Sequence, residues 1–246
     1  MERQQKETRM ESGSSRATHD ATTHDATIDE RDDRPRDAAP ARSSARDSVR
    51  NSLLELSRLA KALSDELGEP VERAGRLIVE SMRSGGKLLA CGNGGSAADA
   101  QHFVAELLGR MGPERRSLPA VTLSVDPSAV TAIGNDYGYD RVFARQLEGL
   151  AREGDVLLAI STSGRSRNVL EAIRTAHAHG MRVVALSGKS GDPLLEECDV
   201  CIHIPAESTQ RVQELHMAVL HAICERVDEQ VLSGALPHPN PPRGRE

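Results

Sequence analysis

The chain of 246 residues has no Trp and only four other aromatic residues, two Phe and two Tyr. Aromatic side chains bring the largest apolar surfaces to protein cores, and they are the platforms on which proteins stack single-stranded bases. A chain this poor in them must build its core from Leu, Val, Ile, Ala and Met. The same shortage argues against single-strand nucleic-acid binding through base stacking.

Long apolar runs, excess positive charge and dense cysteines are also missing. No stretch approaches the roughly 18 apolar residues of a membrane span, and the first residues, MERQQKETRM, lack the apolar segment of a secretory signal. The 31 basic and 37 acidic residues give a net charge of −6, which argues against phosphate-backbone binding. Four cysteines in a chain of this size form no disulfide framework. We therefore expect a cytoplasmic protein without nucleic-acid or membrane partners.

The composition divides the chain into three regions. Residues 1–46 contain one large aliphatic residue, Ile28, so they cannot bury enough apolar area to offset the entropy lost on ordering. We expect this segment to be a disordered tail. Residues 234–246 are rich in Pro, which breaks helices and strands, and should form a second tail. The folded domain is expected to span residues 47–233.

Within this domain, short apolar runs alternate with helical stretches. The runs are continuous enough for buried parallel strands, and they cover residues 87–91, 120–124, 155–161, 182–188 and 199–205. Two amphipathic helices precede them, one capped by Asp47 or Ser48 and one beginning near Pro70. Later helices are expected over 97–110, 127–150, 166–179, 193–197 and 208–232. The pattern predicts an α/β fold with helices on both faces of a parallel sheet, and ligands at the carboxyl ends of the strands.

The first loop that indicates a ligand is GNGGS (92–96), between a predicted strand and a predicted helix. Glycines allow a sharp turn and close approach to backbone N–H groups, and the helix behind them presents its positive end. The run GNGGSA also matches the dinucleotide-binding pattern G-x-G-x-x-A. That interpretation requires an acidic residue about 20 positions further on. The candidate, Asp126, follows Gly92 by 34 residues, so a nicotinamide cofactor is disfavoured.

The second loop, STSGRS (161–166), places four hydroxyl side chains before a predicted helix. Hydroxyl and backbone N–H donors at a helix N-terminus can surround a phosphate. A helix cap, the alternative interpretation, needs only one Ser or Thr. The loop therefore predicts a phosphate site.

One face of the helix after the first loop carries Asp99, His102, Glu106 and Arg110 at steps of three or four residues. The alternative to a functional face is a solvated charged stripe. His102 and Glu106, four residues apart, can share a metal ion.

The last predicted helix supplies further candidates, Gln213, Glu214, His216 and His221. Gln213 and His221 are about 80° apart around the helix, so they meet at one centre only with extended side chains, or they serve sites shared between chains. His216 is interpreted as a packed or capping histidine.

Two segments have plainer interpretations. Cys198 and Cys201 form a C-x-x-C pair without the second pair of a four-cysteine zinc site, so we interpret them as structural. The stretch GNDYGY (134–139) reads as a turn between two helical segments, or as a loop whose polar groups bind sugar hydroxyls.

Four segments together resemble the phosphoheptose isomerases, the sedoheptulose 7-phosphate isomerases of the sugar isomerase (SIS) domain superfamily. The segments are 91–110, 134–148, 158–170 and 208–225, and the resemblance covers about residues 47–233. It implies a five-stranded parallel sheet flanked by helices, in a homotetramer with active sites at subunit interfaces. It also implies conversion of sedoheptulose 7-phosphate to D-glycero-D-manno-heptose 7-phosphate.

Carried over to this chain, the resemblance implies Glu106 as general base and His221 as general acid. It implies one zinc ion per subunit, with the ligands His102, Glu106, Gln213 and His221. The implied substrate contacts are Asn93, Gly94, Gly95, Glu106, Asn135, Asp136, Ser161, Thr162, Ser163, Ser166 and Gln213. Some relatives have Asp where this chain has Gln210, so no role is carried over there.

The chemistry agrees with these residue types. Moving a carbonyl to the neighbouring carbon requires a base to take a proton from carbon and an acid near the carbonyl oxygen, tasks for Glu and His. A metal can stabilise the enediolate. Tight zinc binding would weaken Glu106 as a base, so either its metal bond loosens or zinc has a supporting role.

Two other functions stay open at this stage. Some SIS proteins bind the bacterial replication initiator without catalysis, and those relatives lack the catalytic Glu and His that this chain has at Glu106 and His221. An isomerase of another sugar phosphate would use the same residues. We also expect the four aromatic rings to line the active site or the interface beside it; they are Phe103, Tyr137, Tyr139 and Phe143.

Overall fold

The structure, a computed structural model, describes residues 44–188 and 193–235. Most of both expected tails therefore lies outside the described residues. Helix α1 (Ala45–Leu63) begins earlier than expected, because Ser44 caps it: Ser44 Oγ accepts a hydrogen bond from the Asp47 N–H at 3.1 Å. The predicted cap at Asp47 or Ser48 is thus wrong by one helical turn.

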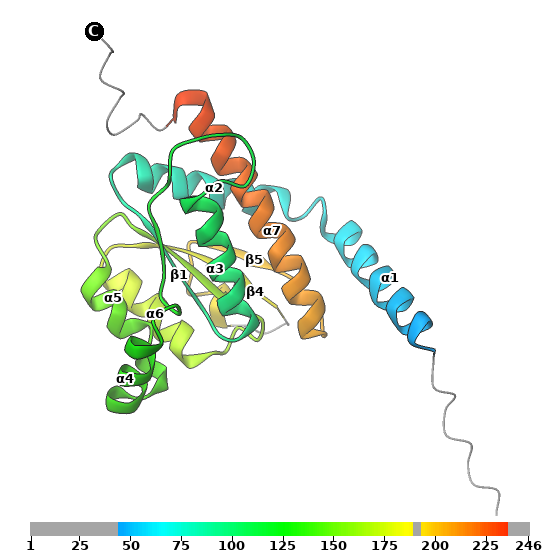
Figure 1. Ribbon diagram of the computed structural model, residues 1–246, viewed down its shortest axis with the longest axis horizontal. Coiled ribbons are helices and arrows are strands. Elements are labelled where there is room, and N and C mark those ends of the chain that lie inside the picture. The colour runs from blue at the N-terminus through cyan, green and yellow to red at the C-terminus, as the bar shows by residue number, and fades with distance from the viewer. Residues whose placement is uncertain (1–43, 189–192, 236–246) are drawn as a thin grey trace, which may run out of the picture. The chain divides into compact units, whose positions relative to one another are not determined.

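A five-stranded sheet lies at the centre of the fold, as the sequence predicts (Figure 1). Its strands are β1 (Leu88–Gly92), β2 (Ala120–Thr122), β3 (Val156–Ser161), β4 (Arg182–Ser187) and β5 (Val200–His203). They lie in the order β2-β1-β3-β4-β5, and every neighbouring pair is parallel. The chain leaves β1 toward β2 and then crosses back to β3. The order therefore reverses between β1 and β3, where open α/β sheets bind ligands.

Helices cover both faces of this sheet (Figure 1). On one face, α2 (Gly68–Arg83), α3 (Gly95–Leu108) and α7 (Thr209–Gln230) share a core with Leu158 and Ile160. On the other face, α5 (Ala144–Leu150) and α6 (Arg167–Ala178) pack with Leu157 and Ala159. Alternate residues of β3 thus serve opposite cores, which explains why the strands are apolar throughout rather than at every second position.

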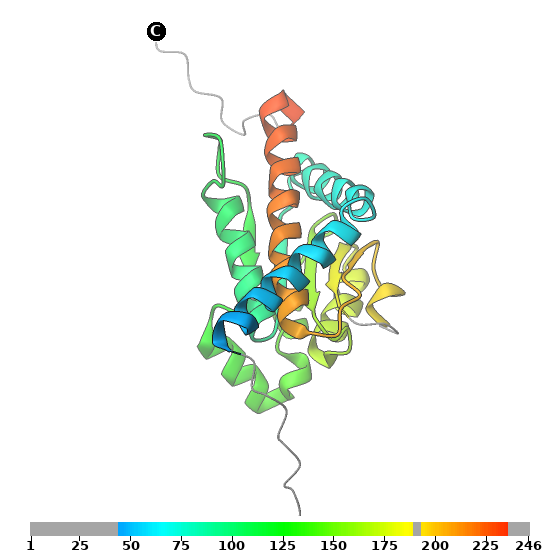
Figure 2. The ribbon, with the colours of Figure 1, turned by 90° about the vertical axis from the view of Figure 1, so that its right-hand side faces the viewer.

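The two N-terminal helices have different roles. Ile78 and Val79 of α2 are buried in the core against the sheet. Helix α1 buries only Leu63 and runs past the outside of α7 (Figure 2), where the Arg211 guanidinium donates to the Ser52 carbonyl at 2.6 Å. In the described part of the chain, no helix is long and apolar enough to span a membrane.

The stretch expected as one helix over 127–150 is three elements: α4 (Pro127–Tyr137), the 3-10 turn η1 (Tyr139–Arg141), and α5. The chain breaks at Gly138, whose φ of +88° is a conformation that residues with a side chain rarely adopt. Asn135 and Asp136 consequently lie inside α4 and not in a loop.

The remaining elements are short. The helix expected over 193–197 is the 3-10 turn η2 (Pro193–Leu195), and α7 ends in the π-helical turn η3 (Val231–Ala235). Asp126 caps α4, because its Oδ1 accepts from the N–H groups of Ser128 and Ala129 at 2.9 and 3.1 Å. This role is structural and agrees with rejecting Asp126 as a ribose ligand.

Candidate active site

The two ligand loops of the sequence lie at the carboxyl ends of β1 and β3, where the strand order reverses. The register places Gly92 of β1 beside Ile160 of β3, so the loops 92–96 and 161–166 leave the sheet next to each other. The helices that follow them, α3 and α6, lie on opposite faces of the sheet. The loops therefore lie side by side at the carboxyl ends of the strands, where the sequence predicts ligands and where sheets of this class bind them in a crevice.

Two positions of the first loop require glycine, one for lack of space and one for its backbone conformation. A Cβ at Gly92 would lie 2.6 Å from the backbone oxygen of Ser96, so the following turn passes directly over its α-carbon. Gly94 has φ +55° and ψ −121° and occupies the N-cap position of α3 without a side-chain cap. The amino end of α3 is therefore left accessible to a ligand in the crevice.

The hydroxyls of the second loop point toward one another. Ser161 Oγ lies 3.1 Å from Ser166 Oγ and 3.5 Å from Ser163 Oγ, and Gly164, with φ +61°, turns the chain between them. Ser166 occupies the N-cap position of α6 but makes no side-chain cap hydrogen bond. Simple helix capping thus does not account for the loop, and the gathered hydroxyls fit an anion. Thr162 is half-buried in the same loop.

Three predicted catalytic and metal-binding residues converge between α3 and α7. His102 Nε2 lies 3.0 Å from His221 Nε2 and 3.4 Å from Glu106 Oε1. The two imidazole rings meet edge to face, with centroids 5.2 Å apart. Gln213 lies nearer the start of α3, where a Cβ on Gly95 would come within 2.3 Å of its amide nitrogen.

The two imidazole nitrogens and the carboxylate suit a zinc ion in chemical type, whereas the Gln213 amide lies nearer Gly95. Two nitrogens bound tetrahedrally at about 2.1 Å from zinc lie about 3.4 Å apart. The separation of 3.0 Å between the histidine nitrogens is close to that value. Across residues 44–188 and 193–235, no three His, Cys, Asp or Glu side chains are already arranged as a metal centre. Zinc therefore stays a prediction.

The face of α3 is only partly solvated, since the His102 side chain is 43% exposed while Asp99 and Glu106 are more buried. Asp99 is buried, and this desolvation raises the pKa of its carboxyl to about 6, against the lowering effect of His102. The Glu106 side chain is only 20% exposed. Arg110 departs from the pattern, since it is exposed and pairs with Glu114 at 3.1 Å.

The position of α3 relative to α7 is held by a buried ion pair that sequence reasoning missed. Arg115 Nε donates to Asp228 Oδ1 at 2.5 Å, and both side chains are almost fully buried. The same guanidinium donates to the carbonyls of Glu106, Leu107 and Gly109 at 2.7 to 3.1 Å. It therefore satisfies the carboxyl end of the helix that carries Glu106 and joins that end to α7. A loop arginine gives no sequence signal for this role.

The segment after β2 reaches the crevice through a tyrosine. Tyr139 of η1 donates from its hydroxyl to Asn93 Oδ1 at 3.1 Å. Asn135 and Asp136 are exposed on α4 and hydrogen-bond to each other at 2.8 Å. No described contact joins either of them to the two loops, so their role as substrate contacts stays a prediction.

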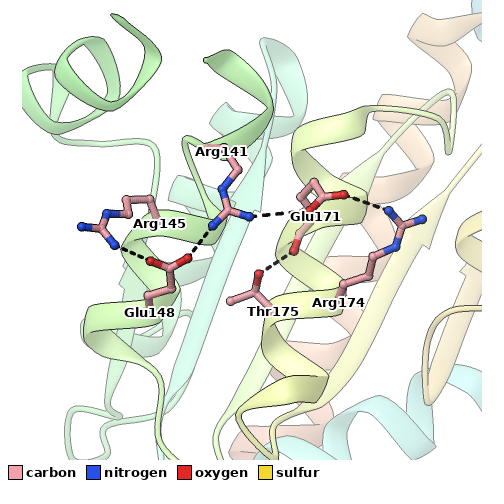
Figure 3. A network of polar contacts seen from close by, with 6 residues as sticks. All are labelled: Arg141, Arg145, Glu148, Glu171, Arg174 and Thr175. Atoms are coloured by element: carbon pink, nitrogen blue, oxygen red, sulfur yellow. Dashed lines mark hydrogen bonds and ion pairs between the residues drawn. The ribbon is translucent and has the colours of Figure 1, made fainter. Parts of the chain in front are cut away.

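A chain of ion pairs fastens this segment to α6 (Figure 3). Arg141 pairs with Glu148 of α5 at 2.5 Å and with Glu171 of α6 at 3.7 Å, while Arg145 and Arg174 extend the chain at either end. Exposed pairs contribute little stability singly, but a connected set resists displacement better than one pair. The network thereby keeps Tyr139 near Asn93.

A second missed residue is Asn168, in the first turn of α6. Its side chain is 3% exposed and makes two hydrogen bonds with Asn93, at 2.9 and 2.8 Å. The signal was present in the sequence, because Asn168 precedes Ala172 and Ala176 by steps of four and is a polar residue on the buried face of α6.

The interpretation of His216 as a packed histidine is confirmed. The residue is fully buried, its Nε2 donates to the Ser187 carbonyl at 3.0 Å, and burial lowers its pKa to about 4. The prediction for the aromatic rings holds only for Tyr139. Phe103 and Phe143 are core residues instead, because large apolar rings are most favourable where water is excluded. Tyr137 stacks beneath the Arg145 guanidinium, 5.1 Å from the ring centroid.

The five-stranded parallel sheet and the paired loops at its point of strand reversal define the chain as an SIS-domain protein. A family model described as SIS domain matches residues 53–188. The phosphoheptose isomerase of Thiobacillus denitrificans is 55% identical over 172 residues, which cover 69% of this chain and 87% of that protein. That of Aliarcobacter butzleri is 48% identical over 183 residues, covering 74% and 96%. The chain belongs to the phosphoheptose isomerase family.

Solved structures support the same assignment. A phosphoheptose isomerase from Neisseria gonorrhoeae is 44% identical, with a TM-score of 0.71 over 75% of this chain and 98% of that one. One from Francisella tularensis is 35% identical, with a TM-score of 0.73 over 76% of this chain and 100% of that one. The predicted fold class is therefore confirmed.

Proposed function

We propose that the crevice between β1 and β3 converts sedoheptulose 7-phosphate to D-glycero-D-manno-heptose 7-phosphate, with Glu106 as base and His221 as acid. The observation that carries the proposal is the meeting of Glu106, His102 and His221 between α3 and α7, together with the gathered hydroxyls of the loop after β3. Family membership supports the reaction class. The reaction needs an anion site, which the hydroxyls of residues 161–166 would supply, and a proton-transfer site, which Glu106 and His221 would supply.

In the forward reaction, Ser161, Ser163 and Ser166 would bind the substrate phosphate with their hydroxyls. Glu106 takes a proton from C1 as the C1–C2 double bond forms, and His221 gives a proton to the carbonyl oxygen on C2, yielding an enediol. His221, now without its proton, takes the proton of the C1 hydroxyl as the C1 carbonyl forms, and Glu106 returns a proton to C2. Every proton removed is thus replaced, and no external oxidant or reductant is needed.

A metal ion held by His102, Glu106, Gln213 and His221 would supply positive charge that stabilises the enediolate. The Glu106 side chain is 20% exposed, so its carboxylate is accessible to solvent. We propose that Glu106 binds such an ion loosely, because a carboxylate tightly held by a metal is a weaker base.

We further propose a cytoplasmic homotetramer whose active sites lie at subunit interfaces. An apolar groove of about 690 Å³ runs along α3 and β2 directly beside His102, with the exposed side chains Leu108, Val121 and Val125 along it. Exposed Val49, Leu53 and Leu54 form a second apolar patch on α1. Apolar surfaces of this kind typically mark protein interfaces.

The decisive experiment supplies purified full-length chain with sedoheptulose 7-phosphate, with and without zinc, and follows the product by NMR. Product formation is the expected result. An inactive chain that instead captures the bacterial replication initiator in a pull-down would overturn the proposal in favour of a binding protein. Higher kcat/KM for a hexose or pentose phosphate would overturn the heptose assignment while leaving the reaction class intact.

A further inference from the structure

Asn93 and Asn168 form a reciprocal pair of side-chain amides across the crevice. Asn93 Nδ2 donates to Asn168 Oδ1 at 2.9 Å, and Asn168 Nδ2 donates back to Asn93 Oδ1 at 2.8 Å. Asn93 lies in the glycine-rich loop immediately before Gly94. Asn168 lies in the first turn of α6, two residues after Ser166, the last residue of the hydroxyl loop. The pair therefore connects the two loops directly, side chain to side chain.

Tyr139 adds a third hydrogen bond to this pair, from its hydroxyl to Asn93 Oδ1 at 3.1 Å. A carboxamide has two N–H donors and an oxygen with two lone pairs. Asn168 and Tyr139 together occupy both lone pairs of the Asn93 oxygen, and Asn168 also accepts one of its two N–H groups. Asn93 is left with a single N–H, so its side chain can offer a substrate only a donor.

We infer that Asn168 is a positioning residue for the isomerisation: it fixes the orientation of the Asn93 amide and sets the spacing between the phosphate-binding and proton-transfer ends of the crevice. The inference rests on the proposed function. The group that meets the Asn93 side chain must then be an acceptor, namely a hydroxyl or carbonyl oxygen of the sugar.

The burial of Asn168 gives this role its physical basis. Its side chain is 3% exposed, while Asn93 is half-buried at the crevice. A buried amide keeps its hydrogen bonds because water cannot replace them. Without Asn168, Asn93 would have to turn toward another partner, and its free N–H would no longer have a fixed direction. Small errors in placement are costly to reactions that depend on aligned groups.

The test uses two substitutions of Asn168 in the full-length enzyme. Asn168→Asp keeps the shape and the acceptor but cannot donate, and it sets a carboxylate oxygen against Asn93 Oδ1. Asn168→Leu removes both hydrogen bonds. For each variant we expect kcat for sedoheptulose 7-phosphate to fall about tenfold or more, as for a lost positioning contact. For Asn168→Leu, which adds no charge and leaves the hydroxyls of the second loop in place, the inhibition constant for inorganic phosphate should change by less than about threefold.

The control is Ser81→Ala, a buried polar contact at the opposite end of β3. Ser81 Oγ donates to the Gly154 carbonyl at 2.6 Å, just before that strand begins. The variant should lose thermal stability and keep its kcat. Tyr139→Phe removes only the third hydrogen bond and should lower kcat by about two- to fivefold.

The outcomes separate this inference from the proposed function. A wild-type enzyme that forms no product overturns the proposed function itself. Wild-type turnover combined with an Asn168→Leu variant whose kcat is within about twofold of it overturns the inference alone. So does an inhibition constant for phosphate that rises in step with the loss of kcat, because that result means a general collapse of the loops.

Discussion

The Nε2 atoms of His102 and His221 lie 3.0 Å apart, although the two residues are separated by 119 positions in the chain. Each histidine lies on a helix that packs on the same face of the sheet, α3 and α7, and Glu106 follows His102 one turn later on α3. The contact therefore places a proposed base, a proposed acid and a second imidazole at one point between α3 and α7.

The assignment of Glu106 as base predicts a large loss of turnover in Glu106→Gln. The amide keeps the size of the side chain but cannot accept a proton from carbon, so kcat should fall by about 100-fold or more. KM should change little if the phosphate loop provides most of the binding. Steady-state kinetics with sedoheptulose 7-phosphate measure both constants, and near-normal turnover would refute the assignment.

The role of a metal is tested by removing it. We expect rigorous chelation to lower turnover, and stoichiometric zinc to restore it, because an ion held by His102 and His221 would stabilise the enediolate. Elemental analysis of the protein before and after chelation reports occupancy independently of activity. A chelated, metal-free enzyme with unchanged kcat would remove the metal from the mechanism.

Ser166→Ala should weaken substrate binding more than chemistry. Its hydroxyl lies 3.1 Å from Ser161 Oγ and does not cap α6, so its loss removes a phosphate donor without destabilising the helix. We expect KM and the inhibition constant for inorganic phosphate to rise about tenfold, with kcat nearly unchanged. Unchanged phosphate inhibition would place the anion elsewhere.

Arg115→Met should destabilise the fold, because it leaves the buried Asp228 carboxylate without its ion-pair partner and the carbonyls at the end of α3 without donors. Breaking a buried ion pair in this way costs about 3–5 kcal/mol of unfolding free energy. The matched control is Glu114→Gln, which removes an exposed pair with Arg110 and should cost less than about 1 kcal/mol. Urea denaturation measures both, and equal losses would contradict the prediction.

The stability of the fold should fall in acid partly because of His216. Burial lowers its pKa from the ordinary 6.5 to about 4, so the unfolded chain takes up this proton at a higher pH than the folded chain. The stability that neutral His216 contributes is complete above about pH 6.5 and is lost as the pH falls toward about 4. The total loss in unfolding free energy is at most about 3 kcal/mol.

The His216 contribution is isolated by comparing wild type with His216→Gln, whose amide can still donate to the Ser187 carbonyl. Other titrating groups, such as Asp99 with its raised pKa, cancel in this difference. Urea denaturation at neutral pH and near pH 4.5 should show the steeper loss in wild type. Identical pH dependence of the two proteins would exclude His216 as the source.

Much of the architecture follows from local patterns in the chain. Five apolar runs became five parallel strands. The runs are most uniformly apolar in β1 and β3, because a strand buried on both faces needs apolar residues at every position. The helix break at Gly138 was harder to predict from the sequence. Many glycines can adopt a positive φ, and it is the packing of η1 that requires one here. The placement of Asn135 in α4 was missed for the same reason.

In the candidate site, too, local sequence predicts some features and not others. The hydroxyl run of residues 161–166 exceeds what a helix cap needs, so the sequence predicts a phosphate site there, and the structure shows that three of these hydroxyls lie close together. The role of Arg115 could not be predicted from the sequence. Its guanidinium donates to four backbone carbonyls near the end of α3 and to Asp228 of α7, and Asp228 reaches it only when α3 and α7 pack. Asn168 lies between these cases: its buried position was readable from helical spacing, whereas its partner Asn93 was not.

The α/β class, the positions of the two loops and the helix face carrying His102 and Glu106 follow from the amino-acid sequence, because turn chemistry and residue periodicity act over a few neighbouring positions. The meeting of His221 with His102 and the pairing of Asn168 with Asn93 follow only from the packing of the folded chain. Those contacts depend on the crossing of helices distant in sequence and on the order of β1 and β3, which no local pattern specifies.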